Sequence, residues 1–224
     1  ANVVLAARSV DALKDLSAKI EAAGGKSIAV ACDVSKYDDV KAAVDQAVAA
    51  FGSLDILVNN AGLIDPIARL EDSDPESWAY VADVNYKGVY YCIHAALPEL
   101  KKAGGGTIIN VSSGAAVSAL EGWSHYCSSK AAVLSLTKCV DTECREEGIR
   151  IIGMSPGTVA TEMQVSIKSS GINPVSQLDP AVHIPASWPA KAIAWLCGSG
   201  GDDFRGVDFS LRDETNRRNI GLID

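Results

Sequence analysis

The chain has 224 residues, of which 48% are hydrophobic and 21% are charged, and its formal net charge is −8 at pH 7. An acidic chain of this kind repels phosphate groups, so neither nucleic acid nor an anionic membrane is expected as a partner. No apolar run approaches the about 18 residues of a membrane span, and no signal segment opens the chain. The six cysteines form neither a CxxC pair nor a zinc-binding pattern, so we expect no bound metal and a location in the reducing cytoplasm.

Short apolar segments alternate with segments of helical periodicity along the whole chain. In chain order they predict a strand over 2–7, a helix over 10–23, a strand over 27–31, a helix from Ser35 to Phe51, a strand over 54–58, a helical stretch from Pro75, a helix over 86–102, a strand over 107–111, a helix over 124–147, a strand over 149–154, an irregular segment after Pro156, a helix over 190–196 and a strand over 207–211. Ser35 is the expected N-cap of its helix, and Gly52 is the expected stop.

Buried apolar strands separated by helices predict an α/β fold, a Rossmann-like, doubly wound parallel sheet covered by helices on both faces. No internal repeat or linker divides the chain, so residues 1–224 are expected to form a single domain. Ligands of such sheets bind at the carboxyl ends of the strands. The polar or unusual residues at those ends are Arg8, Asp33, Asn59, Ser113 and Pro156.

Tyr126 and Lys130 are spaced i, i+4 on a predicted helix, so their side chains share one face. A nearby ammonium group favours phenolate and should lower the phenol pKa, and a phenol tuned in this way can exchange a proton with a carbonyl or alcohol oxygen. The hydroxyl of Ser113, which follows the 107–111 strand, can hold the same oxygen. The alternatives are a solvated helix face for the pair and an ordinary turn for the serine.

Several segments occur in a fixed order: Asn59-Asn60-Ala61-Gly62 after a strand, Asn85 in Val84-Asn85-Tyr86-Lys87-Gly88, then Ser113, Tyr126 and Lys130, then Pro156-Gly157. In this order and spacing, residues 1 to about 165 resemble the short-chain dehydrogenase/reductase family, in particular ketoreductases of the 3-oxoacyl-carrier-protein reductase type. The resemblance implies that Tyr126 is the catalytic acid/base and that Ser113 positions the substrate carbonyl. It implies that Lys130 holds the nicotinamide ribose hydroxyls while depressing the pKa of Tyr126. Asn85 would anchor a proton-relay water, and a helix-interior asparagine satisfied by backbone is the alternative.

The resemblance also implies a groove for a nicotinamide dinucleotide. Its expected cofactor-binding residues are Arg8, Asp33, Val34, Asn60, Ala61, Gly62, Tyr126, Lys130, Pro156, Gly157, Val159 and Thr161. Ala61 and Gly62 lack large side chains, so a dinucleotide backbone can pass close, although a plain turn has the same composition. Asp33 resembles the family's adenine-binding aspartate, and a helix-capping residue is the alternative.

The residue after the first strand bears on which dinucleotide binds. An acidic residue there would favour NAD, but this chain has Ala7-Arg8-Ser9. The Arg8 guanidinium can bind the extra phosphate of NADP through charge-assisted hydrogen bonds. NADP(H) is therefore favoured and NAD(H) is the alternative, while an ordinary surface arginine is the other interpretation of Arg8.

One family feature is missing from the sequence, namely the first strand and its Thr-Gly-x-x-x-Gly-x-Gly turn, which place the pyrophosphate at a helix N-terminus. Gly104-Gly105-Gly106 cannot replace this turn because it joins a helix to a strand, the opposite order. We therefore expect the domain to be N-terminally incomplete, with that strand before Ala1. The sheet should have a gap between the 2–7 and 54–58 strands.

The substrate side is less regular. The resemblance places a substrate-covering lid over about 158–186. Six residues are candidates for lining a mainly apolar pocket: Leu63, Ile64, Trp123, Met163, Val165 and Ile167. His125 neighbours Tyr126 but points about 100° away on the helix, so we interpret it as a non-catalytic wall residue. Phe209-Ser210 stands where the family usually has a glycine pair, and the tail from Leu211 and the 124–147 helix are candidate contacts of a homodimer or homotetramer.

The sequence therefore predicts an oxidoreductase that interconverts a small ketone or aldehyde and an alcohol with NAD(P), most simply a reductase using NADPH. A non-catalytic dinucleotide-binding scaffold or sensor on the same fold is the alternative. The presence of Tyr126, Lys130, Ser113 and Asn85 together argues against it. A sugar-nucleotide epimerase would need a larger substrate domain than the chain after Pro156 provides.

Overall fold

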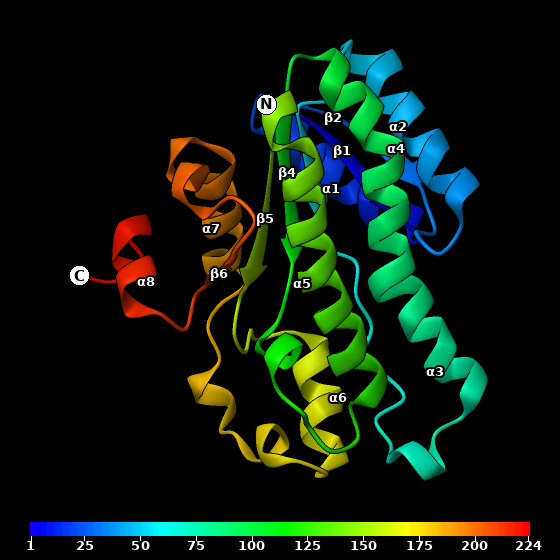
Figure 1. Cartoon of the computed structure of the whole chain (residues 1–224), viewed down its shortest axis with the longest axis vertical. Coiled ribbons are helices and arrows are strands. Elements are labelled where there is room, and N and C mark those ends of the chain that lie inside the picture. Colours follow the sequence, from blue (N-terminus) through cyan, green and yellow to red (C-terminus); the bar gives the residue numbers. More distant parts are fainter.

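The computed structural model describes residues 1–224 as strands that alternate with helices (Figure 1). The strands are β1 (Asn2–Ala7), β2 (Lys26–Ala31), β3 (Ile56–Asn59), β4 (Gly106–Val111), β5 (Ile149–Ser155) and β6 (Asp208–Ser210). The α-helices are α1 (Val10–Ala22), α2 (Tyr37–Phe51), α3 (Pro75–Ala82), α4 (Gly88–Lys102), α5 (Ser124–Cys144), α6 (Glu162–Ser170), α7 (Ser187–Cys197) and α8 (Glu214–Ile220). None of these helices is both long and apolar enough to cross a membrane.

Every strand pair is parallel, and the strands form two groups in the orders β1-β2 and β3-β4-β5-β6. The predicted α/β fold with a Rossmann-like parallel sheet is confirmed. β1 and β3 are not paired with each other, which confirms the gap expected between them. Ile56 and Val58 of β3 are 42% and 38% exposed, unusually high for apolar residues of a parallel strand.

The four-stranded group is covered on both faces, as Figure 1 shows with α4 and α5 on one side and α7 on the other. Alternation along the strands explains this, because Ile108 of β4 and Ile151 of β5 belong to the core with α4 and α5. The neighbouring residues Ile109 and Ile152 belong to the core with α7. The carboxyl ends of β4 and β5 point toward the end of the molecule where α6 lies (Figure 1).

The start of α2 differs from the sequence prediction. Lys36 rather than Ser35 occupies the N-cap position, and no side chain caps the helix. Ser35 donates from its backbone N–H and its hydroxyl to Oδ1 of Asp33, at 3.0 and 2.7 Å, so its polar groups are already used in a tight turn. The predicted stop is confirmed, because Gly52 ends α2 in the left-handed conformation with φ 86°.

The chain after Pro156 holds more helix than predicted. Glu162–Ser170 forms α6 where an irregular segment was expected, because Ile167 is buried and Gly171 ends the helix in the left-handed conformation. The unusual tail forms α8, whose first turn is capped by the Asp213 side chain. Helix α8 packs against α7 of the same chain.

Candidate active site

The carboxyl ends of β3 and β4 are tied to α5 by buried asparagines. Nδ2 of Asn59 donates to Oδ1 of Asn110 at 2.8 Å, and Nδ2 of Asn110 donates to Oγ1 of Thr137 on α5 at 2.9 Å. All three side chains are buried. Buried polar groups that are paired in this way rigidify their surroundings, so the helix that carries Tyr126 and Lys130 is held in a fixed position over the strands.

Tyr126 lies in the first turn of α5 and is 8% exposed. Its ring meets the ring of Trp123 edge to face, with 5.7 Å between centroids and 75° between planes. Ile64 and Ile167 belong to the same buried apolar cluster. The ring is therefore fixed by packing, independently of what its hydroxyl contacts.

Lys130 lies one turn further along α5 and is 4% exposed. Its Nζ donates to the carbonyl oxygen of Val111, the last residue of β4, at 2.7 Å, and lies 5.7 Å from the centroid of the Tyr126 ring. Burial lowers the pKa of Lys130 from 10.5 to about 8, although the charge of Asp208 opposes the shift. The predicted sharing of one helix face by Tyr126 and Lys130 is confirmed.

The Tyr126 hydroxyl differs from the sequence prediction in its acidity. Burial raises the pKa of the phenol, an interaction with the Ser113 hydroxyl opposes the increase, and the Cys127 thiol adds to it. The expected lowering by Lys130 is not found: burial is the largest influence on the phenol pKa, and the Ser113 hydroxyl is the group that lowers it. In this structure the phenol is an acid that keeps its proton at neutral pH.

Ser113 lies two residues after the end of β4 and is the N-cap of a short 3₁₀ turn, Gly114–Val117. Its Oγ accepts a hydrogen bond from the backbone N–H of Ala115 at 3.1 Å, which fixes the rotamer of the hydroxyl. The Ser113 hydroxyl interacts with the Tyr126 hydroxyl, so the structure brings a residue after β4 and a residue of α5 together.

Asn85 lies in a π-helical turn, Asp83–Lys87, that joins α3 to α4. Its side-chain amide pairs with the backbone of Leu63, accepting from the N–H at 2.7 Å and donating to the carbonyl at 2.8 Å. Nδ2 also approaches the Ser129 hydroxyl at 3.3 Å. The amide is satisfied by the backbone of a distant loop, which holds the segment after β3 against α5. Such π-turns often occur at functional sites.

Gly62 lies close to both Asn85 and Lys130. A methyl group on Gly62 would lie 3.6 Å from Oδ1 of Asn85 and 3.9 Å from Nζ of Lys130. Asn60 and Ala61 before it are exposed. The segment after β3 therefore approaches the lysine closely and leaves an open face toward solvent.

Arg8 and Asp33 lie at the ends of the adjacent strands β1 and β2. Nη1 of Arg8 donates to the Tyr80 hydroxyl on α3 at 2.9 Å. The pKa of Asp33 is lowered, first by the Ser35 hydroxyl and to a lesser extent by the charge of Arg8. Asp33 caps no helix, so that alternative is wrong. Val34 packs against Gly88, where a methyl group would lie 2.9 Å from Cγ2 of the valine.

Pro156 and Gly157 follow β5, and Gly157 adopts a φ of +79° that favours glycine. Val159 and Ile184 form a parallel bridge. The backbone N–H of Ile184 donates to the carbonyl oxygen of Thr158, and the backbone N–H of Ala160 donates to the carbonyl oxygen of Ile184, both at 3.0 Å. The exposed Thr161 donates its hydroxyl to the Val159 carbonyl at 3.3 Å. The segment predicted as a lid is thus tied at both of its ends.

The candidate apolar lining divides into buried and exposed members. Ile64, Trp123 and Ile167 are buried together with Tyr126, and Met163 packs against them. Val165 is 62% exposed and makes no part of this cluster. Nε2 of the buried His125 lies 2.8 Å from the carbonyl oxygen of Ile64, an arrangement in keeping with a structural side chain.

Two residues near the site were not singled out from the sequence. Asp208, on β6, accepts a hydrogen bond from the Ser155 hydroxyl at 2.6 Å, and burial raises its pKa against the opposing effects of Ser155, Ser112 and Lys130. Arg212 contacts the turn after Ser113. For Arg212 the only signal in the sequence was its place just after the last strand, where such sheets bind ligands.

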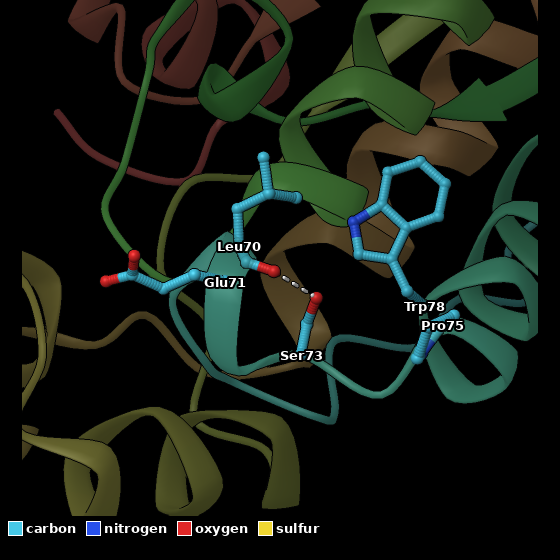
Figure 2. A pocket seen from close by; sticks show the side chains of 5 residues that line it. All are labelled: Leu70, Glu71, Ser73, Pro75 and Trp78. Atoms are coloured by element: carbon cyan, nitrogen blue, oxygen red, sulfur yellow. Dashed lines mark hydrogen bonds between the residues drawn. The ribbon is translucent and has the colours of Figure 1, made fainter.

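A hollow of about 380 Å³ lies elsewhere, on the turn before α3, and is lined by Leu70, Glu71, Ser73, Pro75 and Trp78. Figure 2 shows the Ser73 hydroxyl donating to the Leu70 carbonyl across it, at 2.8 Å. The indole N–H of Trp78 donates to the hydroxyl of Ser124, the first residue of α5, at 2.9 Å. None of the residues proposed for chemistry lines it.

Comparison with known proteins places this geometry in context. Residues 1–171 match the short chain dehydrogenase family. The chain is 33% identical over 198 residues to the cyclohexanol dehydrogenase of Acinetobacter sp., which covers 87% of this chain and 77% of that protein. It is 37% identical over 145 residues to the 3-oxoacyl-(acyl-carrier-protein) reductase FabG of Staphylococcus aureus, which covers 65% of this chain and 58% of that protein.

Among solved structures, a 7α-hydroxysteroid dehydrogenase complexed with NADH and 7-oxo glycochenodeoxycholic acid superposes with a TM-score of 0.83 at 26% identity. The superposition covers 94% of this chain and 82% of that structure. The chain thus spans between about three fifths and four fifths of the length of these three proteins.

Proposed function

The chain belongs to the short-chain dehydrogenase/reductase family of oxidoreductases, and on this basis we propose that it interconverts a small ketone or aldehyde and an alcohol by hydride transfer, with Tyr126 as the acid/base. The observation that carries the proposal is the convergence of Ser113, Tyr126 and Lys130 at the carboxyl end of β4. Relatives in this family act on CH–OH and carbonyl groups. We assign the proposed reaction to these three side chains.

The proposed proton transfer uses the buried phenol. In the reductive direction Tyr126 gives its proton to the substrate oxygen, while the Ser113 hydroxyl donates a hydrogen bond to the same oxygen. The raised pKa of Tyr126 supports this direction, since the phenol stays protonated at neutral pH. The ammonium group of Lys130 is buried beside the ring and stabilises the phenolate that remains after the proton is transferred.

Residues on the open face of the site fit a nicotinamide dinucleotide, which supplies the hydride when bound. The fit rests on two observations. Gly62, which has no side chain, lies close to Lys130, and Asn60 and Ala61 are exposed. We assign the nicotinamide end to Lys130 and the Pro156–Thr161 segment, and the adenine end to Asp33 and Val34. Asn85 is proposed to hold a relay water close to Lys130.

NADP(H) is the proposed cofactor, with NAD(H) as the alternative. Arg8 supports this preference because it supplies an exposed guanidinium at the end of β1. Arg8 makes a single side-chain hydrogen bond, to the uncharged Tyr80 hydroxyl, so the guanidinium keeps donors for a phosphate. The 7α-hydroxysteroid dehydrogenase named above binds NADH.

Three further features belong to the proposal. Residues 158–186 act as the substrate lid, supported by the ties at Val159 and Ile184. The protein works as a homodimer or homotetramer, with α5 as a candidate contact face. A cytoplasmic location is supported by six cysteines that are all free.

The test is turnover of a panel of ketones and alcohols, including a generic diketone, with NADPH, NADH and the oxidised cofactors. Consumption of reduced cofactor that depends on the carbonyl compound is the expected result. Tight cofactor binding without any turnover would favour the non-catalytic scaffold instead.

A further inference from the structure

The tail after β6 carries an arginine to the mouth of the site. A methyl group on Gly114 would lie 3.5 Å from Nη1 and 3.7 Å from Cζ of Arg212, and one on Gly157 would lie 3.7 Å from Cγ of the same side chain. Gly114 directly follows Ser113, and Gly157 follows Pro156 after β5. The side chain of Arg212 therefore passes over both loops that flank the proposed carbonyl site, with its guanidinium against the serine loop.

The charge of Arg212 has no partner within the chain. Only its backbone N–H makes a hydrogen bond, to the Ser210 hydroxyl at 3.2 Å, and the side chain forms neither a hydrogen bond nor an ion pair. The acidic residues beside it are engaged elsewhere, since Asp213 caps α8 and Glu214 pairs with Arg218. An exposed guanidinium in a chain of net charge −8 thus stays free beside the site.

The loop that carries Arg212 is anchored. Nδ2 of Asn216 donates to the Ser210 carbonyl at 2.9 Å, and Nε of Arg217 donates to the Leu211 carbonyl. Leu211 is fully buried, and the Arg217 guanidinium lies 5.5 Å from the Trp188 ring on α7. The turn between β6 and α8 is therefore fixed from both sides, and Arg212 stands on it as a charged group of defined position.

We propose that Arg212 binds a carboxylate of the substrate, so that the protein acts on a short oxo acid and its hydroxy acid. This inference rests on the proposed function, because it takes the reacting oxygen to lie at Ser113 and Tyr126. The guanidinium lies next to Gly114, the residue that follows Ser113, so the substrate that we propose carries its carboxylate only a few bonds from the reacting carbonyl. Guanidinium pairs with carboxylate through two parallel hydrogen bonds, which a single arginine can supply without a cluster of cations.

The experiment compares 4-oxopentanoate with its methyl ester as substrates, since the pair differs in charge at one end. Wild-type protein should show a higher kcat/KM for the acid, and the preference should fall as ionic strength rises. Arg212→Gln should raise the KM for the acid about tenfold and leave the kinetics of the ester unchanged. Arg212→Lys should restore part of the preference because the charge returns without the planar fork.

Arg218→Gln is the matched control, since Arg218 is an exposed arginine of α8 away from Gly114 and Gly157. Equal loss on acid and ester in Arg212→Gln, or a wild-type preference for the ester, would overturn the inference and leave the proposed function standing. Turnover of neither compound by a wild-type protein that turns over other carbonyl compounds would overturn the inference alone, whereas no turnover of any ketone or alcohol with either cofactor would count against the proposed function.

Discussion

Replacement of Tyr126 by phenylalanine isolates the proposed acid/base. The change removes only the hydroxyl, while the ring keeps its edge-to-face contact with Trp123 and its place in the cluster with Ile64 and Ile167. The phenol oxygen interacts with the Ser113 hydroxyl, so the free energy of unfolding should change by no more than about 1 kcal/mol.

Turnover should respond far more strongly than stability. Loss of a positioned proton donor lowers a rate by about 10²–10⁴, which corresponds to about 3–5 kcal/mol in the activation free energy. The assay is carbonyl-dependent oxidation of NADPH under saturating substrate, with cofactor affinity measured separately by fluorescence titration. Cofactor affinity should change little, because the removed hydroxyl acts on the substrate oxygen.

Tyr91→Phe is the matched control, because Tyr91 is a half-buried tyrosine of α4 in contact with Tyr37 rather than with the site. It should leave turnover unchanged. A Tyr126→Phe protein that unfolds like wild type and still turns over at a near-normal rate would refute the reasoning, since the proton would then come from another group.

Three further predictions concern the cofactor, a buried charge and a loop. Arg8→Asp should shift the ratio of catalytic efficiencies from NADPH towards NADH by about tenfold or more, because it replaces the phosphate-binding charge by a ribose acceptor. Tyr80→Phe controls for the lost Arg8 contact, and a wild-type preference for NADH would contradict the assignment. Lys130→Met should flatten the rise of unfolding free energy with pH. The pKa of the lysine is about 8 in the folded protein and 10.5 ordinarily. The burial penalty of about 3 kcal/mol is therefore fully present below pH 8 and is lost as pH rises towards 10.5. Parallel stability curves for the variant and wild type between these values would contradict the burial of this charge. Asn85→Ala should lower the unfolding free energy by about 1–3 kcal/mol in urea titrations, since it leaves both backbone groups of Leu63 unpaired, and unchanged stability would mean that water replaces the amide.

The order of strands and helices was predictable because its signals are local. Apolar runs mark β4 and β5, and Gly52 stops α2 where the pattern placed it. The gap between β1 and β3 was predicted from the absence of the family's glycine-rich turn in the sequence rather than from any residue present. Helix α6 was not predicted because a single deeply buried residue, Ile167, holds it among prolines and glycines.

The site was predictable to the extent that spacing along one helix fixes it. Tyr126 and Lys130 share a face because they are one turn apart. The acidity of Tyr126 was wrongly predicted, since its burial depends in part on Ile64 and Ile167, which come from distant segments. The π-turn at Asn85 and the approach of Arg212 to Gly114 depend on long-range contacts, for which a single sequence gives no local signal.

The ties at Val159 and Ile184 have a consequence for how the protein can be changed. Because the two ends of the segment between them are already joined, its length adds little to the cost of closing it, about 0.6 kcal/mol for each doubling of a flexible loop. Residues can therefore be inserted or exchanged between the ties without disturbing β5 or Gly157. Exposed positions of the segment, such as Val165, are therefore the place to change substrate preference, whereas Ile167 has to stay because it packs in the buried cluster that holds the Tyr126 ring.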